Sequence, residues 1–106
     1  MNVSRRVLFS TPDSKFESRV FDLQAGGYSS LEKHEHEHCV MVLAGEGTVR
    51  LGDDIQTIAA LDLIHIQPWQ IHQFKAGPEG LKILCIVDRI RDVPVLIEND
   101  CAPEAS

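Results

Sequence analysis

Residues 27–47 read GYSSLEKHEHEHCVMVLAGEG, and the alternating run from His34 to His38 inside this stretch constrains the fold most. Side chains two residues apart on a β-strand point the same way, so Glu32 and the histidines of the run share one face. Residues four apart on an extended chain are separated by roughly 13 Å, whereas a metal–nitrogen bond is only about 2.0–2.1 Å long. If these side chains bind one ion, the chain must turn between the first and the last of them. The natural place for the turn is residues 35–37, between the end of one strand and the start of the next.

The donor atoms of this cluster point to a transition metal. Four of the five histidines lie in two places, the run at residues 34–38 and His72. Imidazole and carboxylate together suit Zn, Fe, Mn, Ni or Cu, and they do not favour the all-oxygen shell of calcium. The sequence therefore predicts a divalent transition metal as cofactor.

The rest of the chain has an all-β pattern. Short β-branched runs alternate with turn residues such as Gly26-Gly27 and Gly77-Pro78, and no longer stretch carries apolar residues at helical spacing with caps at both ends. About eight short strands at this spacing favour a sandwich or a barrel, and the periodic turns fit a jelly roll. The expected strands cover residues 19–24, 29–34, 38–44, 47–51, 55–59, 63–66, 72–76 and 82–87, with one more short strand at 95–97.

Two stretches resemble the sequence motifs of the cupin family. The first is residues 27–47, with a glycine, a His-x-His pattern, a third ligand a few residues on and a glycine turn at Gly45. The second is residues 61–74, LDLIHIQPWQIHQF, in which a turn with Pro68 precedes a histidine that serves as fourth ligand. The resemblance spans roughly Leu23 to Val87. It implies a small single-domain, RmlC-like cupin, which is a double-stranded jelly-roll β-barrel with one metal ion inside.

The register of the two motifs implies a specific ligand set when it is counted back from the glycine turn. The third ligand position falls on a histidine and the first histidine position on a glutamate, so the implied ligands are Glu32, His34, His38 and His72. Two departures weaken the transfer of a specific activity. Trp69 stands where the second motif has a glycine, and the usual asparagine after the last histidine is absent.

Other interpretations of these residues stay open. His36, as a turn residue, is expected at the rim of the site, although a His34-His36-His38 set without Glu32 is possible, and histidines can be buried without any metal. His65 alternates with apolar neighbours and is expected to face away from the barrel lumen.

Composition restricts the classes of function. The 106 residues carry a net charge of −6, which argues against a nucleic-acid partner. Three cysteines without the spacing of a disulfide scaffold indicate reduced thiols and a cytoplasmic location. No apolar leader or span of about eighteen apolar residues is present, so no membrane partner is expected. We expect one domain over residues 1–106, with an N-terminal arm at 1–15, a barrel core at about 16–90 and a C-terminal tail at 91–106.

The predicted function is the binding or conversion of a small molecule inside the barrel. The lumen is expected to be lined by the ligands together with Val40, Val42, Ile64 and Ile66, which is the usual design of a small-molecule site. Three histidines and one carboxylate leave positions open on an octahedral Fe, Mn, Ni or Zn, so a metal-dependent dioxygenase or isomerase reaction is one hypothesis. The alternative is a non-catalytic module that binds a small ligand or a structural metal. The resemblance and the unpaired sheet edges favour a homodimer.

Overall fold

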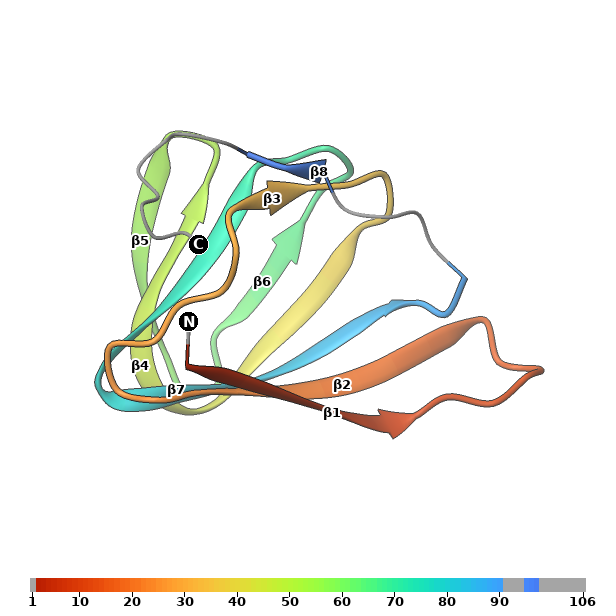
Figure 1. The fold of residues 1–106 in the computed structure, drawn as a ribbon, viewed down its shortest axis with the longest axis horizontal. Coiled ribbons are helices and arrows are strands. Elements are labelled where there is room, and N and C mark those ends of the chain that lie inside the picture. Colours follow the sequence, from red (N-terminus) through yellow and green to blue (C-terminus); the bar gives the residue numbers. More distant parts are fainter. Residues whose placement is uncertain (1, 91–94, 98–106) are drawn as a thin grey trace.

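The computed structural model describes residues 2–90 and 95–97, and every regular element in them is a β-strand (Figure 1). The prediction of an all-β fold is confirmed. None of the described segments is a helix with the length and apolarity of a membrane span. The strands are β1 (Val3–Phe9), β2 (Phe16–Leu23), β3 (Glu32–Lys33), β4 (His38–Leu51), β5 (Asp54–Ala59), β6 (Leu63–Ile66), β7 (His72–Asp88) and β8 (Val95–Leu96).

Two long bent strands, β4 and β7, form the frame of the molecule. They pair antiparallel along almost their whole length, from His38 opposite Val87 to Leu51 opposite His72. The sequence pattern predicts each of them as two separate strands, because glycines interrupt the apolar runs. In the structure these glycines lie at bends within continuous strands, with register shifts on either side of Gly45.

The bend in β4 requires glycine for steric reasons. Gly45 has a φ of +83°, and a Cβ atom at this position would lie 2.2 Å from the carbonyl oxygen of Gly80. At Gly47 a Cβ atom would lie 2.0 Å from the carbonyl oxygen of Lys75. These contacts are with backbone atoms, which cannot move aside cheaply. The glycines therefore let β4 and β7 cross closely and curl the sheet around a central space.

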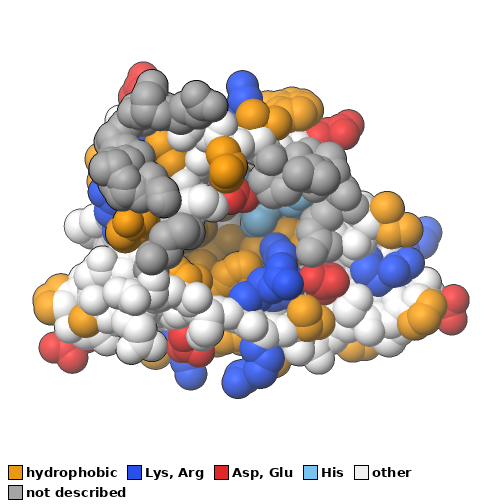
Figure 2. Space-filling view, in the orientation of Figure 1, with side chains coloured by type: hydrophobic (Ala, Val, Ile, Leu, Met, Phe, Trp, Pro, Cys, Tyr) orange, Lys and Arg blue, Asp and Glu red, His pale blue; other side chains and the backbone are white. Residues whose placement is uncertain are grey.

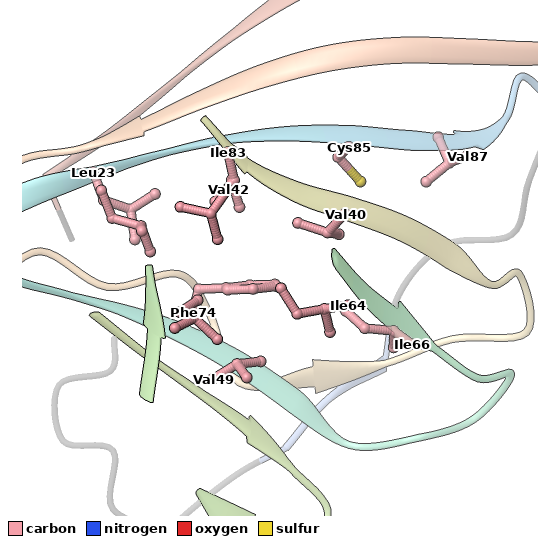
Figure 3. Close-up of a cluster of buried hydrophobic side chains, with 12 residues drawn as sticks. Leu23, Val40, Val42, Val49, Ile64, Ile66, Phe74, Ile83, Cys85 and Val87 are labelled. Carbon is pink, nitrogen blue, oxygen red and sulfur yellow. The ribbon is translucent and has the colours of Figure 1, made fainter. Parts of the chain in front are cut away.

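Alternation along the strands separates the core from the surface. Val40, Val42 and Val49 of β4 point inward with Ile64 and Ile66 of β6, as labelled in Figure 3. Cys39 and His65 occupy the intervening positions and are exposed, as period-two patterning predicts. This apolar core fills one part of the barrel and supports the strand ends that carry the histidines.

The chain ends add strands to the curled sheet. Residues Val3–Phe9, which were expected to lie in an N-terminal arm, form β1 and pair antiparallel with β2 from Val3 opposite Leu23 onward. The predicted short strand near residue 95 is present as β8 and pairs with β3. Residues 91–94 and 98–106 of the predicted tail lie outside the described residues.

Candidate metal centre and cavity

Three histidines from distant positions meet inside the curled sheet. His34 follows β3, His38 begins β4 and His72 begins β7, and β3 is tied to β7 by the pairing of Glu32 with His72. One ligand atom from each of the three imidazoles lies within 4.8 Å of the other two. The turn predicted between the first and last residues of the run is present as a bend at residues 35–36. This geometry could hold a metal ion.

Each of these imidazoles is oriented by its Nδ1 atom. His34 Nδ1 lies 2.8 Å from the carbonyl oxygen of His36, and His72 Nδ1 lies 2.8 Å from the carbonyl oxygen of Gln70. A carbonyl oxygen only accepts, so Nδ1 carries the proton in both rings and Nε2 has a free lone pair. His38 Nδ1 lies 3.0 Å from the thiol sulfur of Cys85. Orientation of a ligand histidine through its other nitrogen is typical of metal sites.

The Nε2 atoms of two of these rings lie close together. His34 Nε2 and His38 Nε2 are only 2.8 Å apart. At this distance either one nitrogen holds a proton that the other accepts, which is possible if the Cys85 thiol donates to His38 Nδ1, or both nitrogens bind a common cation. Two ligands at about 2.1 Å from one ion and at right angles are about 3.0 Å apart. The observed separation therefore fits a shared metal ion.

Burial keeps these imidazoles in the neutral form that binds metal. Desolvation, reinforced by the nearby His34 and His72 rings, lowers the pKa of His38 from 6.5 to about 2. The pKa values of His34 and His72 are also lowered, and burial is again the largest cause. A metal competes with protons for the same lone pairs, so a site with low pKa values is ready to bind it near neutral pH.

Glu32 and His36 lie at the edge of this group. Glu32 Oε1 is 3.8 Å from His34 Nε2, and the Ser30 hydroxyl donates a hydrogen bond to the other oxygen of the same carboxylate. His36 is 7% exposed and stacks flat on His34, with ring centroids 3.7 Å apart and an interplanar angle of 4°. Both side chains border the same cavity as the three clustered histidines. We call Glu32, His34, His36, His38 and His72 together the histidine wall.

The turn before His72 explains one departure from the cupin pattern. Trp69 has a φ of +63°, in the left-handed region that favours glycine, and its backbone N–H donates to the carbonyl oxygen of His34 at 2.7 Å. The backbone thus keeps the glycine-type conformation although the side chain is a tryptophan, which is 52% exposed. This hydrogen bond joins the second turn directly to the first ligand segment.

The histidine wall opens onto a cavity of about 720 Å³. Figure 2 shows a hollow where histidine, hydrophobic and basic side chains meet. Of the four apolar residues expected to line the lumen, Val40 borders this cavity, whereas Val42, Ile64 and Ile66 lie in the packed core. Phe74 and Ile83 contribute further apolar lining. The apolar core therefore fills part of the barrel interior that was expected to be a small-molecule cavity.

Basic residues and a thiol also border the cavity, and sequence reasoning missed them. Arg5 from β1, Arg19 from β2 and Arg89 just after β7 form what we call the arginine wall. Cys85 of β7 is buried between the two walls, because its sulfur contacts both His38 Nδ1 and Arg19 Nη2. The available signal was the period-two alternation of buried positions along β2 and β7, because it places residues 19 and 85 on the inward face of these strands.

The curled antiparallel β-sheet of this chain, with histidines lining its cavity, is typical of the jelly-roll class of β-barrels. Residues 19–87 match the family model of the cupin domain, so the chain belongs to the cupin family. The fold predicted from the two motifs is confirmed.

Known proteins from Rhodospirillum rubrum and Rhodopseudomonas palustris are similar to this chain. The 1-methylthio-D-xylulose 5-phosphate methylsulfurylase of Rhodospirillum rubrum is 43% identical over 96 residues, which cover 90% of this chain and 62% of that enzyme. The chain thus spans less than two thirds of this relative. A crystal structure of a cupin-2 domain protein from Rhodospirillum rubrum superposes with a TM-score of 0.89 at 41% identity, over 92% of this chain and 67% of the other. A cupin 2 conserved barrel protein from Rhodopseudomonas palustris gives 0.86 at 43% identity, over 89% and 66%.

Proposed function

We propose that the chain binds one divalent transition metal through the Nε2 atoms of His34, His38 and His72, with Glu32 as the fourth ligand. The observation that carries this proposal is the 2.8 Å approach of two Nε2 atoms whose rings are oriented through Nδ1. Glu32 supports it because its carboxylate lies beside His34 and its backbone pairs with that of His72. Its negative charge would complement a dication held by three neutral rings.

The proposed activity is that of an enzyme acting on a small phosphorylated keto sugar that carries a methylthio group. Support comes from the similarity to the methylsulfurylase and from a cavity that combines three clustered histidines, an apolar lining and a basic wall. Iron, manganese, nickel or zinc bound at the histidines would act as a Lewis acid on the ketone of the substrate. This is the Lewis-acid role that the isomerase hypothesis gives to the metal, but the overall reaction is a thiol-dependent reductive cleavage and not an isomerisation.

The balanced reaction needs a thiol. The bond between C1 of the sugar and the methylthio sulfur breaks, C1 gains a proton, and a thiol takes up the methylthio group as a disulfide. The thiol is thereby oxidised and the sugar carbon reduced. Within the chain, His36 borders the cavity beside the clustered histidines and is the group placed to hold or deliver the proton. Val40, Phe74 and Ile83 would keep water away from the reacting carbon.

The test combines metal analysis with a turnover assay. Protein purified without a tag is analysed for metals, loaded with Mn, Fe, Ni or Zn, and incubated with 1-methylthio-D-xylulose 5-phosphate and dithiothreitol while proton NMR follows the S-methyl signal. We expect metal-dependent loss of this signal, absent in His72→Ala and retained in His65→Ala, which changes an exposed histidine outside the cavity. A metal-loaded protein that binds the sugar without converting it would favour the non-catalytic module. Oxygen consumption in the same mixture would favour the dioxygenase.

Homodimer formation and a cytoplasmic location stay predictions. β1 stands at one end of the strand order, and its Val7, Leu8 and Phe9 are exposed. This edge is where a second copy of the chain would pair.

A further inference from the structure

Arg19 is a buried cation that faces the cavity. Arg19 is only 6% exposed, and its side chain extends from the inward face of β2 into the lining of the cavity. The Nε atom has no hydrogen-bond acceptor among the residues that the structure describes. A buried charge without full hydrogen bonding is unfavourable, so such a group usually has a partner that completes its donors.

The contacts that Arg19 does make leave its donors incompletely satisfied. The carboxylate oxygen Glu17 Oε2 is 3.7 Å from Nε, which is an ion-pair distance but too long for a hydrogen bond. Arg19 Nη2 approaches the Cys85 sulfur at 3.7 Å, and sulfur is a weak acceptor. The guanidinium carbon also lies 5.1 Å from the centre of the Phe21 ring, a contact that stabilises the charge without accepting a hydrogen bond.

The surroundings make this side of the cavity cationic, although the chain as a whole carries a net charge of −6. Arg5 borders the same cavity from β1. Arg89 also borders it, but its Nε and Nη2 atoms donate to the carbonyl oxygens of Ser14 and Pro12. Arg19 and Arg5 are therefore the members of the arginine wall that we consider for binding an anion.

We propose that Arg19, assisted by Arg5, binds the phosphate group of the substrate. This inference rests on the proposed function, because it takes the metal to bind the keto end of the same molecule. Cys85 touches both Arg19 and His38, so the two subsites are separated by little more than one side chain. A short sugar phosphate could therefore span them. Arginine suits a phosphate because its fork of N–H donors can bind two oxygens at once.

The experiment measures binding and requires no turnover. Calorimetric titrations of the manganese-loaded protein use D-xylulose 5-phosphate, D-xylulose and D-xylonate as probes. The variants are Arg19→Gln, Arg19→Lys and the control Arg6→Gln, which changes an exposed arginine that does not border the cavity. We expect Arg19→Gln to weaken binding of D-xylulose 5-phosphate by about 10- to 100-fold, the effect of losing a charge-assisted hydrogen bond. Arg19→Lys should lose less, Arg6→Gln should lose nothing, and D-xylulose affinity should stay within about twofold in all variants.

Several results would overturn the phosphate subsite. They are an unchanged affinity of Arg19→Gln for the phosphorylated sugar, an equal loss for both sugars, or D-xylonate binding that exceeds phosphate binding and depends on Arg19. If Arg19→Gln does not fold, Arg5→Gln and competition by inorganic phosphate decide, and insensitivity to both rejects the proposal. If Arg19→Gln loses affinity only for the phosphorylated sugar, and the protein never converts the methylthio sugar, the phosphate subsite is supported and the proposed reaction is wrong.

Discussion

The histidine wall and the arginine wall border one cavity but are built in opposite ways. The histidine wall draws four of its five residues from one short segment, residues 32–38, and burial lowers the pKa values of His34, His38 and His72 so that these rings are neutral. The arginine wall collects single residues from β1, β2 and the end of β7, and it is permanently charged. One wall offers lone pairs that suit a cation, and the other offers N–H donors that suit an anion. A ligand that satisfies both would carry oxygens for the metal at one end and negative charge at the other.

The largest expected effect separates the two walls by metal content. His34→Ala, His38→Ala and His72→Ala should each lower metal affinity by more than about 100-fold, because each removes a ligand and second-layer losses alone reach 10- to 100-fold. Arg19→Gln should retain full metal content, since its guanidinium cannot act as a ligand. Inductively coupled plasma mass spectrometry on dialysed protein gives the comparison. Metal retained in all three histidine variants would place the ion elsewhere.

The next expected effect is a pH dependence of the free energy of unfolding, which the neutral histidine wall should cause and the charged arginine wall should not. Burial lowers the pKa of His38 from 6.5 to about 2, so between these values the unfolded chain binds a proton that the folded chain does not. The free energy of unfolding of metal-free protein should therefore fall as the pH falls below 6.5. At about 1.4 kcal/mol per pH unit, His38 alone accounts for a loss of about 2 kcal/mol between pH 6.5 and pH 5.

Urea denaturation at several pH values measures this loss. His38→Gln should flatten the dependence on pH, whereas His65→Gln, at an exposed position, should leave it unchanged. Arg19→Lys should shift the whole curve without altering its slope, because both side chains stay protonated throughout this range. Equal slopes for the wild type and His38→Gln would show that His38 already carries its proton in the folded state.

The contrast between the walls also explains what the sequence could predict. The fold and the clustered histidines follow from patterns that are local in sequence, namely the His-Glu alternation, the period-two strands and the glycine turns. Long continuous strands were missed because Gly45 and Gly47 look like strand ends, and only the close crossing of β4 and β7 shows that they are bends. β1 was missed because Arg5-Arg6 and exposed apolar residues obscure its pairing with β2.

Tertiary placement accounts for the rest. Nothing local distinguishes Arg19 from any other arginine on a strand, and its burial follows from pairing opposite Cys85 in the β2–β7 ladder. The division of the barrel interior between core and cavity likewise depends on packing, which placed Val42 and Ile66 in the core. The sequence identifies Trp69 only as a departure from the family pattern, and the structure shows that its backbone nevertheless has the left-handed conformation that favours glycine.

The smallest expected effect lies within the histidine wall, where Glu32 and His36 compete for the fourth ligand position. The ring of His36 stacks on that of His34 at 3.7 Å between centroids, and the group whose ligand atoms all lie within 4.8 Å of one another consists of His34, His38 and His72 without His36. The Glu32 carboxylate can rotate about its side chain toward the clustered nitrogens, since Oε1 is already 3.8 Å from His34 Nε2.

We therefore expect Glu32→Ala to weaken metal binding and change the preference among Fe, Mn, Ni and Zn. His36→Ala should change the affinity by less than about 10-fold. Competition titrations with a chelator on both variants make the measurement. A site emptied by His36→Ala and left full by Glu32→Ala would move the ion onto the His34-His36-His38 cluster, and the His36 ring would then have to turn out of its stack.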